Sequence, residues 1–127
     1  MKYLLDTDVI INHFKGKQSL NKEVLTGELF ISVITYGELL YGAYKSSRVK
    51  KTLGTISEFL KDFSIKILTL EQATMREYAQ NKVLLEKKGT KLDDFDLLIA
   101  STARVNSCTL LSRNIKHFQR FPGLALG

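Results

Sequence analysis

Three acidic residues stand far apart in the sequence, and each lies beside a segment with a clear structural pattern. Asp6 comes directly after the apolar run at Lys2–Leu5, and Glu38 lies shortly after the run at Leu29–Ser32. Asp96 lies near the start of a later helical pattern. Carboxylates that converge repel one another, and a hard divalent cation such as Mg²⁺ removes that repulsion. Such a cation orients a water and neutralises phosphodiester charge, so phosphodiester hydrolysis is the chemistry these residue types allow.

Short apolar runs alternate with helical patterns along the chain. We expect strands at Lys2–Leu5, Leu29–Ser32, Ile65–Leu68 and Thr109–Ser112. Apolar residues at helical spacing predict helices through Val9–Phe14, Leu39–Ala43, Val49–Leu60, Met75–Leu84 and Leu97–Ala103. Strands that alternate with helices indicate an α/β fold with a parallel sheet covered on both faces.

The expected sheet explains how distant acids can meet. Helices that follow parallel strands begin at the carboxyl edge of the sheet, and ligand sites of open α/β sheets lie at that edge. Asp6, Glu38 and Asp96 therefore converge there. Asn114, which follows the fourth strand, reaches the same edge.

Each acid also has a purely structural explanation. Asp6 and Asp8 can cap the first helix or support its first turn. Glu38 can close a capping box that begins at Thr35. Asp93 or Asp94 can cap the helix that contains Asp96 in its first turn.

Length and composition narrow the possible domain organisation, partners and location of the protein. A length of 127 residues suffices for one compact domain, residues 1–127, and the net charge of +6 favours a polyanionic partner. The lone Cys108 lies in an apolar run, and we expect it to be a small buried hydrophobe. Neither a signal peptide nor a run of about 20 apolar residues is visible, so we expect a cytoplasmic protein without a membrane partner.

Zinc is not expected, because His13, His117 and Cys108 show no ligand-like spacing. We expect His13 on a helix surface and His117 either on the surface or facing nucleic acid.

Four segments in order resemble the PIN-domain ribonucleases, specifically the VapC-type toxins of toxin–antitoxin pairs. The segments run from Leu4 to Ile10, from Ile31 to Leu39, from Phe95 to Ala100 and from Leu111 to Leu124. The resemblance implies a three-layer α/β/α fold with a central, mostly parallel sheet. It also implies an endoribonuclease that uses Mg²⁺ or Mn²⁺ on RNA, often tRNA or rRNA.

The resemblance further implies a site and partners. Asp6, Asp96 and Glu38 would be the metal ligands, with Asn114 completing the catalytic set where many relatives have a fourth Asp. The neutral amide supplies no charge, and Asp8, Asp93 or Asp94 are candidates to restore it. The implied partners are a small VapB-like antitoxin, which covers the site, and a second copy of the chain in a homodimer.

Basic and aromatic residues flank the expected site. Arg113 and Lys116 should lie beside Asn114, where they can contact RNA phosphates. A second basic cluster, at Lys45–Lys51, is equally typical of a solvated helix face. A helical stripe near Glu38 is more typical of core, and where exposed it suits an antitoxin helix. Its members are Tyr36, Leu40, Tyr41 and Tyr44.

Three other functions have to be weighed. The pair Asp6-Thr7-Asp8 is similar to the paired aspartates of phosphatases that form an aspartyl-phosphate, but the later lysine and acidic pair are poorly matched. A receiver domain needs an Asp at the end of the third strand, where this chain has Thr69. Asn114 leaves open a catalytically inactive PIN-like module that binds RNA or protein.

Overall fold

The computed structural model describes residues 1–127 and contains a four-stranded sheet in the order β3-β2-β1-β4. The strands are β1 (Lys2–Leu5), β2 (Glu28–Ser32), β3 (Lys66–Leu68) and β4 (Thr109–Leu111). All three strand pairings are parallel. The chain builds the sheet outward from β1 to β3 and then adds β4 on the other side of β1. The strand order therefore reverses between β1 and β4.

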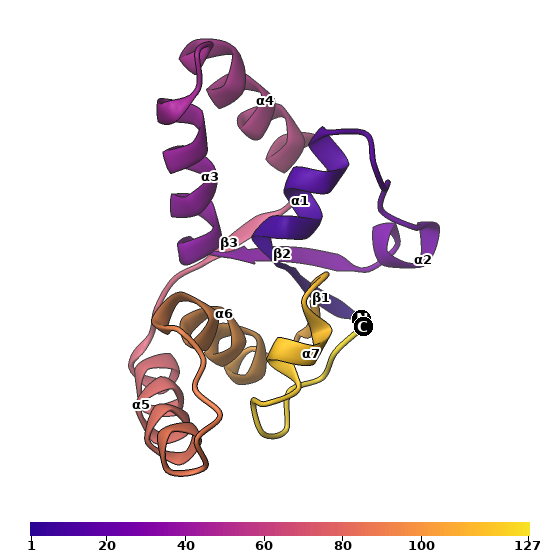
Figure 1. Ribbon diagram of the computed structural model, residues 1–127. Helices are drawn as coiled ribbons and strands as arrows, with labels where there is room; N and C mark the ends of the chain where they lie inside the picture. Colours follow the sequence, from indigo (N-terminus) through magenta and orange to yellow (C-terminus); the bar gives the residue numbers. More distant parts are fainter.

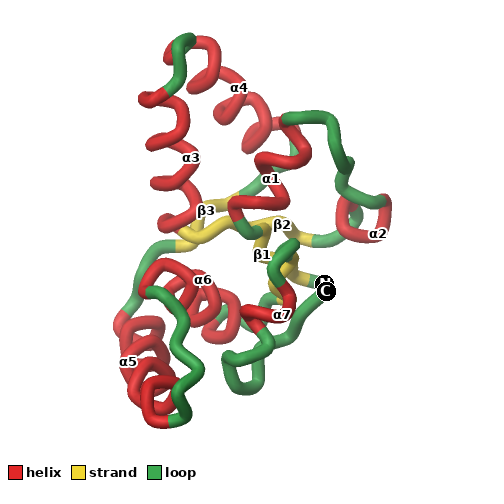
Figure 2. Tube along the Cα trace, viewed as in Figure 1, coloured by secondary structure: helices red, strands yellow, loops and turns green.

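Helices cover both faces of the sheet (Figure 1). They are α1 (Thr7–Phe14), α2 (Lys22–Leu25), α3 (Val33–Lys45), α4 (Val49–Asp62), α5 (Gln72–Lys87), α6 (Asp94–Val105) and α7 (Ile115–Phe118). Figure 2 shows the strands between two groups of helices, α1, α3 and α4 on one side and α5, α6 and α7 on the other. The expected three-layer α/β/α architecture is confirmed. None of the helices combines the length and apolar composition needed to cross a membrane.

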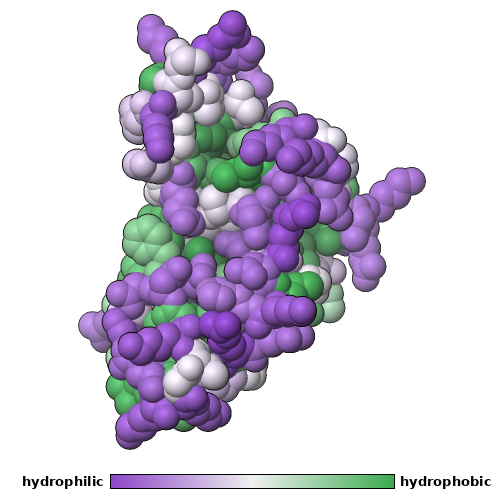
Figure 3. Space-filling view, in the orientation of Figure 1, coloured by the Kyte–Doolittle hydropathy of each residue, from purple (hydrophilic) through white to green (hydrophobic).

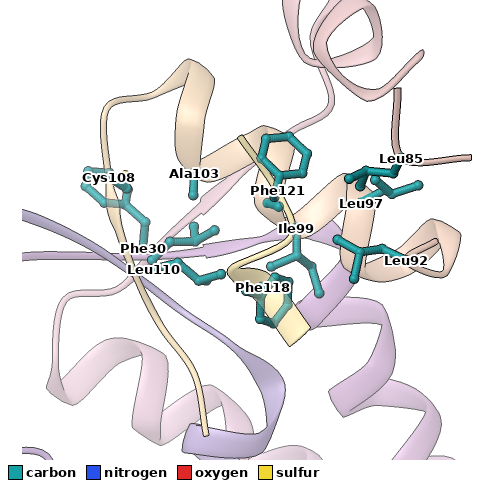
Figure 4. Close-up of a cluster of buried hydrophobic side chains, with 12 residues drawn as sticks. Phe30, Leu85, Leu92, Leu97, Ile99, Ala103, Cys108, Leu110, Phe118 and Phe121 are labelled. Atoms are coloured by element: carbon teal, nitrogen blue, oxygen red, sulfur yellow. The ribbon is translucent and has the colours of Figure 1, made fainter. Parts of the chain in front are cut away.

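Alternating strand side chains build two separate cores, because successive residues of a strand point to opposite faces. Tyr3 and Leu5 of β1 pack under α1 and α3, whereas Leu4 packs with the other layer. Figure 4 shows this second core, in which strand residues meet side chains of α6 and α7. Its buried members include Phe30, Leu97, Ile99, Leu110, Phe118 and Phe121. Cys108 is buried in the same core, as expected.

Two local expectations were incomplete. The short helix α2 was not expected; the side chain of Asn21 caps it by accepting from the backbone N–H of Val24 at 2.9 Å. In α5, the apolar positions Met75 and Val83 are exposed, whereas Thr74 and Asn81 are buried. Apolar spacing predicted this helix but not the face it buries, because the neighbouring helix α6 decides which side is covered.

The expectation that His13 lies on a helix surface was wrong. Its ring is half-buried among Phe14, Phe59 and Phe63, with ring centroids 5.2–6.3 Å away. These phenylalanines come from α1, from α4 and from the residue that follows α4. The packing of α4 against α1 therefore encloses a position that the sequence of α1 alone places on the outer side.

The interior strand β1 should be more sensitive to side-chain truncation than the edge strand β3, because both of its faces are covered. We expect Leu4→Ala to lower the free energy of unfolding by about 2–5 kcal/mol, as for other fully buried leucines. Ile67→Ala on the edge strand β3, where Ile67 is exposed, should cost less than about 1 kcal/mol. Urea denaturation of both variants measures the difference, and equal losses would contradict this account of the core.

Candidate functional site

Asp6 lies where the strand order reverses, between the carboxyl ends of β1 and β4. Its backbone N–H donates to the carbonyl of Leu111 at 2.9 Å, which joins the two strand ends. Its carboxylate accepts from the hydroxyl of Ser112 at 2.8 Å and from the backbone N–H of Thr7 at 2.9 Å. Asp6 is thus the N-cap of α1, and it is only 7% exposed. The structural interpretation of Asp6 as a helix cap is confirmed, and the same carboxylate is buried at the carboxyl edge of the sheet.

Glu38 reaches this edge from α3. Its carboxylate accepts from the Thr7 hydroxyl at 2.6 Å, so the residue after Asp6 also positions Glu38. The capping box at Thr35 was a wrong expectation, because Ser32 is the N-cap of α3 and accepts from the backbone N–H of Thr35. Since Glu38 is not used as a helix cap, its side chain is available to the site.

Asp96 and its neighbours form the third part. Asp93 caps α6 by accepting from the backbone N–H of Asp96 at 3.0 Å, as one interpretation expected. The Asp96 carboxylate pairs with His117 of α7, with Oδ2 and Nε2 2.9 Å apart. Single ligand atoms of Asp93, Asp96 and His117 all lie within 4.8 Å of one another. The contribution of His117 was missed because a single histidine carries no spacing signal.

Asn114 lies between the end of β4 and the start of α7. Its side chain is exposed and makes no hydrogen bond, whereas its backbone N–H donates to the Ser112 hydroxyl at 2.9 Å. Arg113 lies beside it, and its backbone N–H donates to Asp8 at 3.2 Å. The Arg113 guanidinium contacts Gln18, at 3.4 Å, and Asn12. Lys116 is exposed and forms no salt bridge.

Asp94 differs from the other acids because it is paired with a basic side chain. Its carboxylate pairs with Lys82 at 2.8 Å and accepts from the Tyr78 hydroxyl at 2.8 Å, and these bonds lower its pKa. Of the three acids considered as replacements for a charge at position 114, Asp8 and Asp93 therefore remain. The charge of Asp8 raises the pKa of Asp6, and the charge of Asp93 raises the pKa of Asp96.

The carboxylates share one electrostatic environment. Burial raises the pKa of Asp6 from 3.8 to about 7, the Asp8 and Asp96 charges act in the same direction, and bonds from Ser112 and Thr7 oppose them. Burial also raises the pKa of Asp96, as do Asp93 and Glu38, whereas His117 lowers it. Crowded acids thus favour protonation when no cation is present.

The donor set fits a hard divalent cation. Asp6, Glu38 and Asp96 supply oxygen ligands, and none of them is paired with a lysine or arginine. The three do not form a group with all ligand atoms within 4.8 Å, since only Asp96 belongs to the one such group. Ordered water would therefore complete the coordination, as is usual for Mg²⁺.

An apolar groove of about 770 Å³ adjoins these acids. It runs between α1 and α3, and Figure 3 shows apolar side chains in the hollow between these helices. Thr7 and Glu38 line its inner end, while Ile11, Tyr41 and Phe95 provide exposed apolar surface. Tyr41 is 67% exposed and Tyr44 65%, so this part of the aromatic stripe is surface and not core.

The raised pKa of Asp6 predicts a pH-dependent stability of the protein without metal. Between about pH 4 and pH 7, folded Asp6 keeps its proton while unfolded Asp6 is ionised, so stability should fall as the pH rises. Asp6→Asn removes this penalty and should stabilise the metal-free protein at pH 8 by at most about 4 kcal/mol. Thermal unfolding of both proteins in EDTA at pH 5 and pH 8 measures this change in stability.

The matched control is Asp62→Asn, which replaces an exposed acid. It should leave the difference in melting temperature between pH 5 and pH 8 as in the original protein. If Asp6→Asn also left that difference unchanged, the buried-charge account of Asp6 would be wrong.

A family model described as "PIN domain" matches residues 3–124. The tRNA(fMet)-specific endonuclease VapC of Shigella flexneri is 31% identical over 127 residues, covering 98% of this chain and 95% of that protein. Ribonuclease VapC2 of Rickettsia felis is 34% identical, covering 99% and 96%. The crystal structure of VapBC2 from Rickettsia felis, bound to a promoter DNA fragment, superposes with a TM-score of 0.90, 31% identity and coverage of 100% and 98%.

These similarities extend over almost the whole of this chain and of each relative, so they include all four segments that carry the acids, Ser112 and His117. The chain belongs to the PIN-domain family, in its VapC branch.

Proposed function

We propose that this protein is a metal-dependent endoribonuclease of the VapC toxin type, which hydrolyses RNA phosphodiester bonds with Mg²⁺ or Mn²⁺. The observation that carries the proposal is a buried Asp6 that shares an acidic environment with Asp96 and lacks a basic partner. Two relatives named as VapC ribonucleases support an RNA substrate. The Shigella flexneri relative is named as tRNA-specific, which makes tRNA the first substrate to test.

In this proposal the chain's own side chains hold and orient the reacting groups. Asp6 and Asp96 are the direct metal ligands, and Glu38 completes the site either directly or through water. Ser112 and Thr7 donate hydrogen bonds that keep the Asp6 and Glu38 oxygens in place. A bound divalent cation supplies an activated water and neutralises charge on the phosphodiester.

Lys116 and Arg113 are the proposed phosphate contacts. The exposed ammonium group of Lys116 has no salt bridge to give up. Arg113 contacts Gln18 and Asn12 through Nη1 and Nε, so Nη2 is the part of its guanidinium that can bind a phosphate. We assign the larger contribution to Lys116, whose ammonium group has all its donors available.

The groove between α1 and α3 is the proposed antitoxin surface. Similar solved structures include VapBC2 from Rickettsia felis and a toxin–antitoxin complex from Klebsiella pneumoniae, which supports a small VapB-like partner. An amphipathic helix with apolar residues against Tyr41 and Ile11 would cover the groove. A basic side chain at its end could then reach Glu38 and block the site. A homodimer and a cytoplasmic location remain predictions.

RNA cleavage should require both metal and the buried acids. We expect the purified protein to cleave RNA with Mg²⁺ or Mn²⁺, and Asp6→Asn or Asp96→Asn to reduce the rate by at least about 100-fold, because each removes a metal ligand. A gel assay of labelled tRNA measures the rate, and circular dichroism verifies the fold. Cleavage that persists in EDTA or in both variants would refute the mechanism; a metal-binding protein that cleaves nothing would favour an inactive RNA- or protein-binding module.

The antitoxin surface can be tested by placing a charge in the apolar groove. The partner for this test is the product of any short reading frame adjacent to the gene, co-expressed with the protein. Tyr41→Glu should weaken the complex at least about tenfold, because it buries a charge against apolar partner residues. Val83→Glu, on the exposed face of α5 in the opposite layer, is the control and should bind normally. Calorimetry or surface plasmon resonance measures the affinities, and equal binding by both variants would place the partner elsewhere.

A further inference from the structure

The segment after β4, residues 112–121, contacts Asp96 through the side chain of His117. The Nε2 atom of His117 lies 2.9 Å from Oδ2 of Asp96, and both side chains are about three-quarters covered, at 26% and 24% exposure. This is the only salt-bridge-type contact that Asp6, Glu38 or Asp96 makes. Asn114 has an exposed side chain without a hydrogen bond, so it makes no comparable contact.

Hydrophobic packing determines where His117 lies. The next residue, Phe118, is 1% exposed in the core shown in Figure 4, and Phe121 is 2% exposed in the same core. The His117 and Phe118 rings meet edge to face, with centroids 6.1 Å apart. A helix as short as α7 is marginal alone, and these two anchors hold it against the sheet. The imidazole is therefore presented to Asp96 by a rigid support.

The contact between His117 and Asp96 can serve a metal site without any charge on the histidine. A neutral imidazole with its proton on Nε2 donates to a carboxylate oxygen, and the other oxygen of Asp96 stays free to bind a cation. The contact also limits rotation of a carboxylate that Asp93 and Glu38 repel. Groups that orient a metal ligand in this way commonly change metal affinity by about 10- to 100-fold.

We propose that His117 is the residue through which the segment after β4 supports metal binding, as a positioning residue for Asp96. This inference rests on the proposed function, because it assumes a cation at Asp6 and Asp96. Its chemistry is nonetheless separate: His117 acts on the orientation of one ligand, and no RNA need be present to observe it.

Binding of Mn²⁺ to the whole purified protein, without RNA, tests this role. Free Mn²⁺ is measured by electron paramagnetic resonance during a titration at pH 7.5. We expect His117→Ala to weaken binding about 10- to 100-fold, and His117→Gln, whose amide N–H lies where Nε2 does, to stay within about threefold of the original protein. Gln119→Ala, at an exposed position of the same segment outside the site, is the matched control and should stay within about twofold.

The outcomes separate this inference from the proposed function. Asp6→Asn should abolish Mn²⁺ binding; if it does not, the proposed metal site is wrong. If Asp6→Asn acts as expected but His117→Ala binds within twofold of the original protein, only the role of His117 is overturned. A glutamine variant as weak as the alanine variant would also overturn it, because hydrogen-bond donation would then not be what matters. Thermal unfolding in EDTA confirms that each variant is folded.

Discussion

Repulsion among the acids at the carboxyl edge of the sheet is the constraint on which the site depends. Asp6 and Glu38 accept hydrogen bonds and Asp96 contacts His117, but none of the three is paired with a lysine or arginine. Their partners are two hydroxyls, one backbone N–H and one imidazole. Such groups hold carboxylate oxygens in place without cancelling their charge, whereas a basic side chain would do both. The edge therefore holds carboxylates whose ionised form a divalent cation would stabilise.

The three-layer architecture holds this repulsive arrangement together. Buried side chains on both faces of β1 anchor the strand that ends at Asp6. Because the strand order reverses beside β1, the loop after β4 reaches the site from one side and α1 and α3 reach it from the other. Thr7 and Ser112 then bridge segments that are distant in sequence. The same arrangement leaves the groove between α1 and α3 open directly beside Glu38.

Much of this fold follows from local pattern. Apolar runs bounded by polar residues predicted all four strands within about two residues, and helical spacing predicted five of the helices. The errors occurred where a neighbouring element decides exposure. Tyr41 and Met75 are apolar yet exposed, whereas His13 is half-buried among Phe14, Phe59 and Phe63. A one-dimensional pattern carries no information about which face a partner covers.

The site, like the fold, was predictable from the sequence only in part. The sequence by itself determined that Asp6, Glu38 and Asp96 belong at one edge, because strand ends and helix starts of a parallel sheet must meet there. Only the tertiary structure decided which neighbouring side chains contact these acids. The Thr7 hydroxyl donates to Glu38, Asp94 pairs with Lys82, and His117 rather than Asn114 contacts Asp96. These choices depend on side-chain distances of about 3 Å between elements that are separate in sequence, and the packing of the two cores sets those distances.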